Sequence, residues 1–436
     1  MKLYSTKSPE KLVDLEEALF HSLPPDNGLY MPKEIPELPK HFFTEIDQLS
    51  FEEISFKVAK TLLGDSIEEN ALQEIIKDTL SFPAPVKKIE ENIFVLELFH
   101  GPSMAFKDFG ARFMSRLMHY YLEKEKKEIE ILVATSGDTG GAVALGFYKV
   151  PGIKVTILYP KGKVSPLQEK QLTTLGHNIT ALEVDGTFDD CQALVKAAFL
   201  DEELNKAKNL SSANSINIAR LIPQMFYYFN AYAQLKKNND DVKAVFSVPS
   251  GNFGNLTAGL LARRMGLPVA HFVASTNVND TVPKYLKTGK YRSKTSTQTL
   301  SNAMDVGNPS NFERMKDLFD GNHEKMKKEI SGYSFSDQET ENTIREVEQD
   351  SGYILCPHTA IAYKGLKTYL SENNDRELTG IFLSSAHPCK FPNVYDKKLW
   401  SKVELPSHTA ELMKREKQAI SMSKDFDDFK TWLLNN

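Results

Sequence analysis

The sequence predicts an α/β protein made of two open parallel sheets and an additional N-terminal domain. From about residue 90 onward, short apolar runs rich in β-branched residues alternate with helical patterns. This alternation is typical of βαβ units on a parallel sheet. It resumes after residue 240, which implies a second sheet or a second half of the first. Before residue 85 the chain is irregular and punctuated by prolines, as expected of a separate cap.

Chain length supports more than one domain, because 436 residues exceed what a single hydrophobic core usually supports. We expect an N-terminal domain over residues 1–85 and a catalytic region over residues 86–436. The catalytic region should divide into a large and a small α/β subdomain, the small one covering approximately residues 110–235. A deep cleft between subdomains is then available for a ligand.

The individual elements follow from the apolar pattern. Amphipathic helices are expected over 51–63 and 67–80, and the segment 321–350 is charged and reads as solvated helix. The remaining expected strands and helices, in chain order, are 128–135, 141–150, 154–160, 165–175, 179–184, 188–200, 241–249, 256–266, 268–276 and 379–385, followed by a C-terminal helix.

Composition excludes several functional classes. Hydrophobic residues at 41% and charged residues at 25% are ordinary for a globular protein, and a formal charge of −5 provides no basic field for nucleic acid. No apolar stretch approaches the length that spans a bilayer, and the N-terminus has no signal-peptide pattern, so we expect a cytoplasmic protein that binds no membrane. Three widely separated cysteines predict neither a disulfide framework nor a metal site.

The first segment with chemical potential is LFHGPSMAFKDFGARFM, residues 98–114. Lys107 follows three apolar residues and Phe109 lies just after it. Burial disfavours the charged form of a lysine, which is what a nucleophilic amine needs for Schiff-base chemistry. Many lysines beside aromatic residues only lie along the surface, so this environment alone does not identify a catalytic group.

Two later segments share one design, a buried strand followed by a turn of small polar residues and a helix. The turns are Ser136-Gly137-Asp138-Thr139 and Ser250-Gly251-Asn252-Phe253-Gly254-Asn255. Free backbone N–H groups at a helix N-terminus bind carboxylate or phosphate groups. Asp138 would repel an anion, so we expect it to order its loop. Neither turn has the P-loop or dinucleotide spacing, which argues against nucleotide binding.

A fourth segment, GIFLSSAHPCKF, places Ser384 and Ser385 at the carboxyl end of an expected strand, where open α/β sheets bind ligands. A hydroxyl there can hydrogen-bond a cofactor ring nitrogen. A lone histidine beside proline, such as His387, is more often structural than catalytic, and we leave it outside the candidate site.

Taken together, FHGPSMAFKDFG, ATSGDTGGA, SVPSGNFGN and SSAHPCKF occur in the order and at the approximate separations characteristic of threonine synthases. The N-terminal PPDNGLYMP is similar to the opening motif of that family. The resemblance covers essentially the whole chain. It implies pyridoxal phosphate (PLP) as cofactor, PLP fold type II, and conversion of O-phospho-L-homoserine to L-threonine, a carbon–oxygen lyase reaction of class EC 4.2.3.1.

The resemblance also implies residue roles. Lys107 would form the Schiff base with the cofactor, and Ser385 would face its ring nitrogen. The backbone of Gly251, Asn252, Phe253 and Gly254 would bind the cofactor phosphate. The loop Ser136, Gly137, Asp138 and Thr139 resembles the one that receives the substrate carboxylate. Candidates for the substrate's own phosphate are Ser103, Asn302, Ser310, Asn311 and Arg314.

Two alternatives remain open at this stage. A phospho-amino-acid lyase or a serine/threonine dehydratase shares the lysine and the glycine loop but lacks the PPDNGLYMP cap. A homologue that binds a ligand without turnover belongs to a different class, and retention of Lys107 with every loop residue argues against it. The sequence leaves a monomer and a homodimer equally open.

Overall fold

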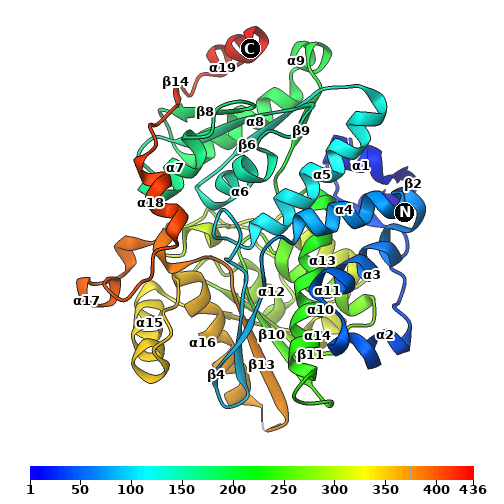
Figure 1. Ribbon diagram of the computed structural model, residues 1–436, viewed down its shortest axis with the longest axis vertical. Helices are drawn as coiled ribbons and strands as arrows, with labels where there is room; N and C mark the ends of the chain where they lie inside the picture. The colour runs from blue at the N-terminus through cyan, green and yellow to red at the C-terminus, as the bar shows by residue number, and fades with distance from the viewer. Residues whose placement is uncertain (374) are drawn as a thin grey trace.

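The fold consists of two parallel-stranded sheets and a small antiparallel sheet near the N-terminus, as seen in a computed structural model that describes residues 1–373 and 375–436. In Figure 1 the five-stranded sheet and the C-terminal helix lie toward the top, and the six-stranded sheet lies toward the bottom. The N-terminal helices lie along one side. The α/β class and the two sheets predicted from the sequence are confirmed.

The N-terminal part begins with three strands in the order β2-β1-β3. The sequence did not predict this sheet, because β2 is almost entirely exposed and shows no apolar alternation. Helix α3 is defined at its start by a capping box of Ser50 and Glu53 and ends at Gly64. The elements are β1 (Lys2–Ser5), β2 (Ser8–Asp14), α1 (Leu15–His21), β3 (Tyr30–Pro32), α2 (Lys40–Glu45), η1 (Ile46–Gln48), α3 (Phe51–Leu63), η2 (Gly64–Ser66) and α4 (Glu69–Thr79).

The five-stranded sheet has the order β14-β8-β7-β6-β9 and is parallel throughout. Parallel strands are covered on both faces, which explains why β6 and β7 are rich in apolar residues and buried along almost their whole length. The elements around this sheet are α5 (Lys107–Glu125), β6 (Ile129–Ala134), α6 (Asp138–Phe147), β7 (Ile153–Pro160), α7 (Pro166–Thr173), β8 (Ile179–Val184), α8 (Phe188–Leu200), α9 (Glu202–Ala207), β9 (Leu210–Ser212), β14 (Ile420–Met422) and α19 (Phe426–Asn435).

The six-stranded sheet has the order β12-β11-β10-β13-β5-β4, with only β4 antiparallel to its neighbour. The strands are β4 (Val86–Glu90), β5 (Ile93–Glu97), β10 (Lys243–Pro249), β11 (Val269–Thr276), β12 (Ile330–Ser334) and β13 (Leu378–Ser384). The helices around it are η3 (Ile218–Arg220), α10 (Ile222–Lys236), α11 (Gly254–Arg264), α12 (Thr281–Thr288), η4 (Asn302–Met304), α13 (Phe312–Leu318), α14 (His323–Glu329), α15 (Asp337–Ser351), α16 (Pro357–Glu372), η5 (Pro388–Lys390), η6 (Pro392–Val394), α17 (Lys397–Trp400) and α18 (Ser407–Lys414).

Strand β12 corrects the expectation that residues 321–350 are helical throughout. It pairs in parallel with β11 at the edge of the sheet. Only Ile330 of this strand is fully buried, so the strand carries no apolar alternation that would separate it from the charged helices on either side.

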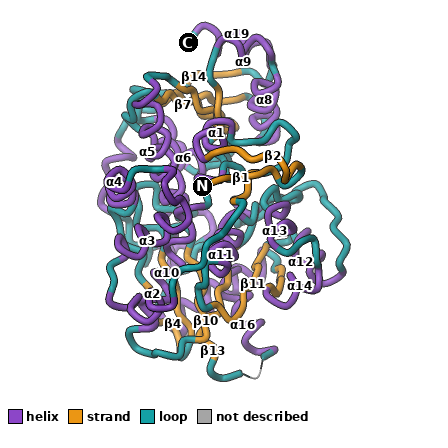
Figure 2. Tube along the Cα trace, turned by 90° about the vertical axis from the view of Figure 1, so that its right-hand side faces the viewer, coloured by secondary structure: helices purple, strands orange, loops and turns teal. Residues whose placement is uncertain are grey.

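The C-terminal segment returns to the five-stranded sheet, where β14 pairs with β8 and α19 packs against α8 and α9 (Figure 2). The sequence predicted a closing helix but not this return. Leu433 and Phe429 of α19 are completely buried in the apolar cluster that also contains Cys191 and Leu194 of α8. Met422, Phe429 and Leu433 therefore anchor the C-terminal segment in the core of this half of the molecule.

We expect Leu433→Ala to lower the free energy of unfolding by about 2–5 kcal/mol, because it opens a cavity in a closed apolar cluster. Leu200→Ala is the matched control, since Leu200 at the end of α8 is 71% exposed. That substitution should change the free energy by less than about 0.5 kcal/mol. Urea denaturation of both variants followed by circular dichroism measures the difference. Equal midpoints for the two variants would show that α19 does not contribute to the core.

Candidate active site

Lys107 stands at the start of α5, and the segment before it is fixed against the end of β13. The Phe106 N–H donates to the Ser385 carbonyl at 2.8 Å, and the His387 N–H donates to the Met104 carbonyl at 3.0 Å. Met104 has a φ of 58°, a left-handed conformation that is unusual for a residue with a side chain. This turn carries the Lys107 amine to the carboxyl edge of the six-stranded sheet.

The electrostatic surroundings of Lys107 favour a free amine. Burial lowers the pKa of Lys107 to about 8, Asp138 opposes this effect, and the positive charges of Lys390 and Arg220 reinforce it. A lysine with this pKa is partly deprotonated near neutral pH, which is the state that attacks a carbonyl carbon.

Asp138 and Lys390 form a buried ion pair beside Lys107. The Lys390 Nζ lies 2.7 Å from the Asp138 Oδ1 and donates to the Ser103 carbonyl at 2.8 Å. Although burial opposes it, the charges of Lys390 and Lys107 hold the pKa of Asp138 well below its usual range. Asp138 is therefore ionised, and its carboxylate binds Lys390 and Gln168 from other segments.

Sequence reasoning did not select Lys390. The sequence feature that could have identified it is that Lys390 is the one lysine or arginine in the SSAHPCKF segment, which follows a strand end where ligands bind. The structure leaves its side chain with no exposed surface. A lysine in that position needs a buried partner, and the sequence alone does not reveal which one.

The loop of residues 136–139 presents free backbone donors at the start of α6. The Thr135 hydroxyl accepts the N–H groups of Gly137 and Gly140, at 2.9 and 2.8 Å. Gly137 has a φ of 138°, and a Cβ there would lie 2.5 Å from the Gln168 side chain. Within the described chain, the N–H groups of residues 136, 138 and 139 meet no acceptor. This geometry suits a bound anion.

The loop of residues 250–255 has the same property at the start of α11. Phe253 is buried with a left-handed φ of 60°, and the N–H groups of residues 251–255 have no acceptor among the described residues. The Asn252 amide donates to the Ser215 hydroxyl and its oxygen accepts the Ser310 N–H, both at 2.6 Å. The loop is thus held open between two other segments, with its amides directed at no protein group.

Asn255 adds a side-chain donor to this loop. Its Oδ1 accepts the hydroxyls of Tyr227 and Tyr228 at 2.6 and 2.7 Å, which fixes the orientation of the amide. Its Nδ2 is buried and has no partner in the described chain. A buried donor without an acceptor is costly unless a ligand supplies one, so this atom marks a ligand position.

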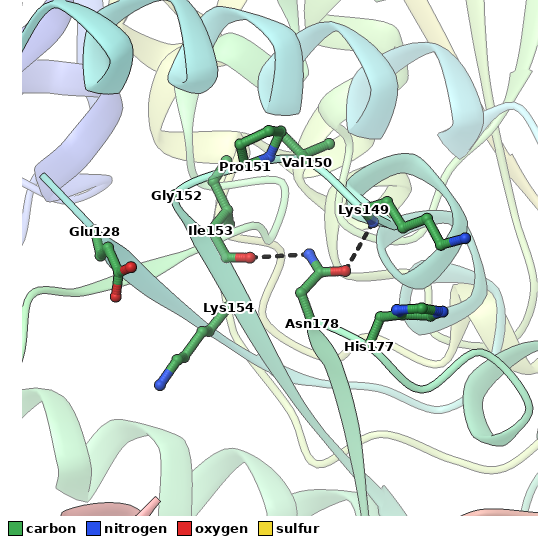
Figure 3. Close-up of a pocket in the computed structure, with 9 residues that line it drawn as sticks. All are labelled: Glu128, Lys149, Val150, Pro151, Gly152, Ile153, Lys154, His177 and Asn178. Carbon is green, nitrogen blue, oxygen red and sulfur yellow. Dashed lines mark hydrogen bonds between the residues drawn. The ribbon is translucent and has the colours of Figure 1, made fainter. Parts of the chain in front are cut away.

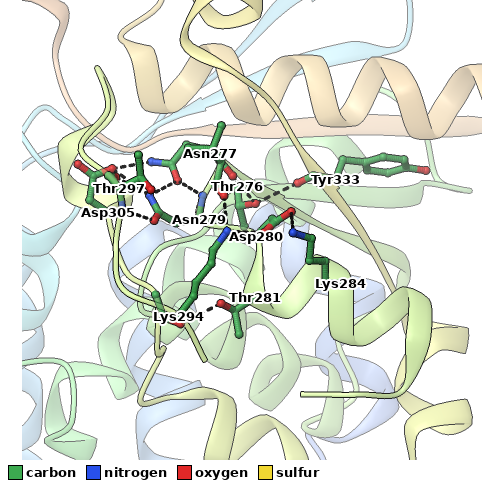
Figure 4. A network of polar contacts seen from close by, with 12 residues as sticks. Thr276, Asn277, Asn279, Asp280, Thr281, Lys284, Lys294, Thr297, Asp305 and Tyr333 are labelled. Carbon is green, nitrogen blue, oxygen red and sulfur yellow. Dashed lines mark hydrogen bonds and ion pairs between the residues drawn. The ribbon is translucent and has the colours of Figure 1, made fainter. Parts of the chain in front are cut away.

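A long segment without regular strands, residues 290–311, lies over the second loop, and we refer to it as the strap. Figure 4 shows the polar network that attaches it to the end of β11. The Asp305 Oδ1 accepts from the Asn277 amide at 2.9 Å and from the Thr299 hydroxyl at 2.7 Å, while the Asn279 amide donates to the Thr297 carbonyl at 2.9 Å. The network fixes residues 302–304 directly against Gly251.

His358 of α16 connects the strap to the Lys107 region. Its Nε2 accepts the Ala303 N–H at 3.2 Å. Burial lowers the pKa of His358 to about 4. The Asp138 carboxylate opposes this shift, and the positive charges of Lys107 and Lys390 reinforce it. The ring is therefore neutral at physiological pH, and it places the strap near the buried charges.

The structure places the remaining predicted residues as follows. Ser385 is buried beside the Lys107 segment, and the neighbouring Ser384 hydroxyl bonds to the Thr359 hydroxyl at 3.1 Å. Ser103 lies four residues before Lys107, and its hydroxyl is buried without a described partner. The Asn302 side chain is partly exposed and bonds to no described residue.

Arg314 departs from its expected role as a substrate ligand. Its guanidinium is completely buried and donates to the carbonyls of Tyr30, Ser215 and Ile216 and to the Asn311 side chain, at 2.6 to 3.3 Å. These bonds engage both Arg314 and Asn311 in holding the 215–216 turn and the strap together. Their geometry supports a structural role, and Ser310 contributes its backbone rather than its exposed side chain.

A surface cavity of about 320 Å³ lies at the opposite end of the five-stranded sheet (Figure 3). It adjoins Gly152 and Ile153 at the start of β7, and the Asn178 side chain accepts the Lys149 N–H there at 2.7 Å. Ligands of open α/β sheets bind at the carboxyl ends of the strands. The cavity is therefore separate from the site at Lys107.

Comparison with known proteins agrees with this geometry. Residues 74–383 match the family model described as pyridoxal-phosphate dependent enzyme, residues 2–80 match threonine synthase N terminus, and residues 359–432 match threonine synthase, C-terminal. The threonine synthase of Haemophilus influenzae is 48% identical over the full length of both chains. The crystal structure of Escherichia coli threonine synthase is 44% identical, with a TM-score of 0.90 and full coverage of both chains. A PLP-bound threonine synthase from Brucella melitensis is 33% identical with a TM-score of 0.91, covering 100% of this chain and 99% of that one.

The fold and the site thus define a pyridoxal-phosphate-dependent enzyme of fold type II. Within that class, the chain belongs to the threonine synthase family, whose members are PLP-dependent lyases. The family prediction made from the four motifs is confirmed. No helix among the described residues could cross a membrane, and no cluster of three or more metal-binding side chains occurs in that part of the chain.

The residues present fit the cofactor. A buried amine at Lys107, an unpaired Asn255 amide and a loop of free N–H groups are the donors that an aldehyde and a phosphate group require. Lys107, residues 251–255 and Ser385 could hold the cofactor, which supplies an electron sink for carbanion chemistry.

We expect Gly251→Ala to weaken cofactor binding tenfold or more. A Cβ at this position would lie 2.7 Å from the Met304 Cα and 2.8 Å from the Ala303 carbonyl oxygen, so the strap or the loop must move. Overpacking of this kind costs about 1–3 kcal/mol. Equilibrium titration of the apoprotein with PLP measures the effect.

Gly254→Ala is the comparison variant, because its Cβ would meet nothing closer than the Asn311 side chain at 3.5 Å. We expect a smaller loss of affinity in this variant. Equal losses for both would contradict the steric explanation for Gly251.

Proposed function

We propose that this protein converts O-phospho-L-homoserine and water into L-threonine and phosphate, the last step of threonine biosynthesis. The observation that carries the proposal is the position of the Lys107 amine. It lies beside the buried pair of Asp138 and Lys390, at the first loop of unpaired backbone N–H groups, and the strap and His358 link this region to the second loop. Two anion sites fit a cofactor phosphate and a substrate carboxylate.

On the cofactor side, Lys107 forms the covalent link and the backbone of Gly251 to Gly254 binds the phosphate, together with the Asn255 amide. The Ser385 hydroxyl would be the group that hydrogen-bonds the ring nitrogen. Unlike an aspartate, a hydroxyl does not hold a full proton on that nitrogen, so the ring is a weaker electron sink. Such a ring suits eliminations and replacements.

On the substrate side, the N–H groups of the Ser136-Gly137-Asp138-Thr139 loop bind the α-carboxylate. Ser103 and Asn302 are the candidates for contact with the substrate phosphate, because each offers a polar side chain without a described partner. Arg314 acts indirectly by holding the strap in place. The substrate phosphate site is therefore built on the strap and on the segment before Lys107.

Lys107 also moves protons in this proposal. Once displaced by the substrate amine, the free Lys107 amine would remove the α proton and then a β proton, and would return one proton to Cγ and one to Cα. Phosphate leaves from Cγ, and water adds at Cβ to give the hydroxyl group of threonine. A low pKa serves both roles, because the lysine must be deprotonated to accept a proton near neutral pH.

We also propose boundaries for the domains. We place the N-terminal domain at residues 1–85 and the catalytic region at residues 86–436, with the small subdomain near residues 110–235 extended by β14 and α19.

Cys191, Cys356 and Cys389 are buried and free, which fits the reducing cytoplasm. We predict that the protein is a monomer or a homodimer, and light scattering would measure which of the two forms in solution.

The test of the proposed function is a product assay of the purified, PLP-loaded protein with O-phospho-L-homoserine. Phosphate and L-threonine should appear in equal amounts. Lys107→Ala should lower the rate on the order of 10³-fold or more, since it removes the proton-transferring group. Lys124→Ala is the control, because Lys124 lies on the same helix with an exposed side chain.

Phosphate release accompanied by 2-oxobutyrate would contradict the proposal and favour the lyase or dehydratase alternative. Cofactor binding without any product would favour a non-catalytic homologue. The match of residues 2–80 to the threonine synthase N-terminal model supports the synthase over both.

A further inference from the structure

Lys390 is a completely buried charged group beside Lys107. It closes the 3₁₀ turn η5, six residues after the end of β13, and its side chain has no exposed surface. Its ammonium has two acceptors, the Asp138 carboxylate at 2.7 Å and the Ser103 carbonyl at 2.8 Å.

The two acceptors of Lys390 come from different parts of the site. Asp138 begins α6 beside the five-stranded sheet, and Ser103 belongs to the segment that leads into Lys107. Helix α7 makes the same connection with amides, because Gln168 donates to Asp138 at 2.9 Å and Gln171 donates to the Ser103 carbonyl at 3.0 Å. The contact is therefore already made by neutral side chains, and Lys390 adds a charge to it.

Stability alone gives a poor reason for this charge. Removing two ions from water costs about as much as their attraction returns, and apolar replacements of a buried pair are often neutral or stabilising. We therefore expect the Lys390 charge to act on a neighbouring group. That group is Lys107, because the reactivity of its amine depends on whether the amine is protonated.

We propose that Lys390 is a positioning residue: it binds the Asp138 carboxylate so that Asp138 cannot pair with Lys107, and it fixes the 136–139 loop to the Lys107 segment. The proposal rests on the proposed role of Lys107 as the cofactor-binding amine. Without Lys390, the Asp138 carboxylate would be left unneutralised near Lys107 and would hold the lysine in its charged form.

Other charged groups around Lys107 cannot replace Lys390. His358 of α16 is neutral, because burial lowers its pKa to about 4. Arg220 of η3 donates to the Ala213 carbonyl. Asp108, the next residue of α5, accepts the Ser103 N–H at 2.9 Å, and burial raises its pKa to about 6. In the structure, the cation bound to Asp138 is Lys390.

The test is a pH titration of the absorbance band of bound PLP in the holoenzyme, without substrate. The band reports protonation of the Lys107 nitrogen joined to the cofactor. Lys390→Met should raise the midpoint by about one pH unit, because it leaves Asp138 unneutralised. The double variant Lys390→Met, Asp138→Asn should return the midpoint to within about half a unit of the unmodified protein, because both charges are gone.

A folded Lys390→Met protein with an unshifted midpoint would overturn the proposal, as would a double variant shifted as far as the single one. A purely structural role would lower the melting temperature and leave the midpoint in place. If Lys390→Met does not fold, Lys390→Gln carries the test, because it removes the charge and keeps a hydrogen-bond donor: a raised midpoint supports the proposal, and an unchanged or lower one overturns it. Because no substrate is used, failure here is distinct from failure of the product assay.

Discussion

The buried charge group of Lys107, Asp138 and Lys390 is the constraint on which the rest of the site depends. Asp138 and Lys390 are buried and Lys107 is half-buried, and a group of charges in such surroundings is stable only if its geometry is fixed and its hydrogen-bonding atoms are satisfied. Gln168 of α7 adds an amide donor to the Asp138 carboxylate, and Gln171 donates to the Ser103 carbonyl that also accepts from Lys390. The outcome is a lysine whose pKa is lowered to about 8.

The fold brings these three residues together because both sheets direct their carboxyl ends toward the same region. Lys107 follows β5, Asp138 follows β6 and Lys390 follows β13. Each segment leaves its strand through an unusual backbone conformation or a tight turn, as with Met104 at a φ of 58°. Unusual conformations of this kind concentrate at functional sites, where the surrounding structure enforces them.

The sequence was sufficient for the central strands of the two parallel sheets and for the two loops of small polar residues, because apolar runs and clusters of glycine, serine and asparagine have direct local causes. The sequence was insufficient where contacts between residues far apart in the chain determine the structure. Strand β14 has three residues and acquires its meaning only by pairing with β8. Arg314 looked like a surface or ligand-binding group, yet backbone carbonyls from residues 30, 215 and 216 surround it. Lys390 was missed for the same reason, since its partner lies about 250 residues earlier in the chain.

The most direct test of the account is the identity of the lysine that carries the cofactor. The PLP-loaded protein is reduced with borohydride, digested, and the modified peptide identified by mass spectrometry. The account predicts a single modified peptide that contains Lys107, because its amine is partly deprotonated while that of Lys390 is bound to Asp138. Modification of Lys390 or of any other lysine in place of Lys107 would contradict it.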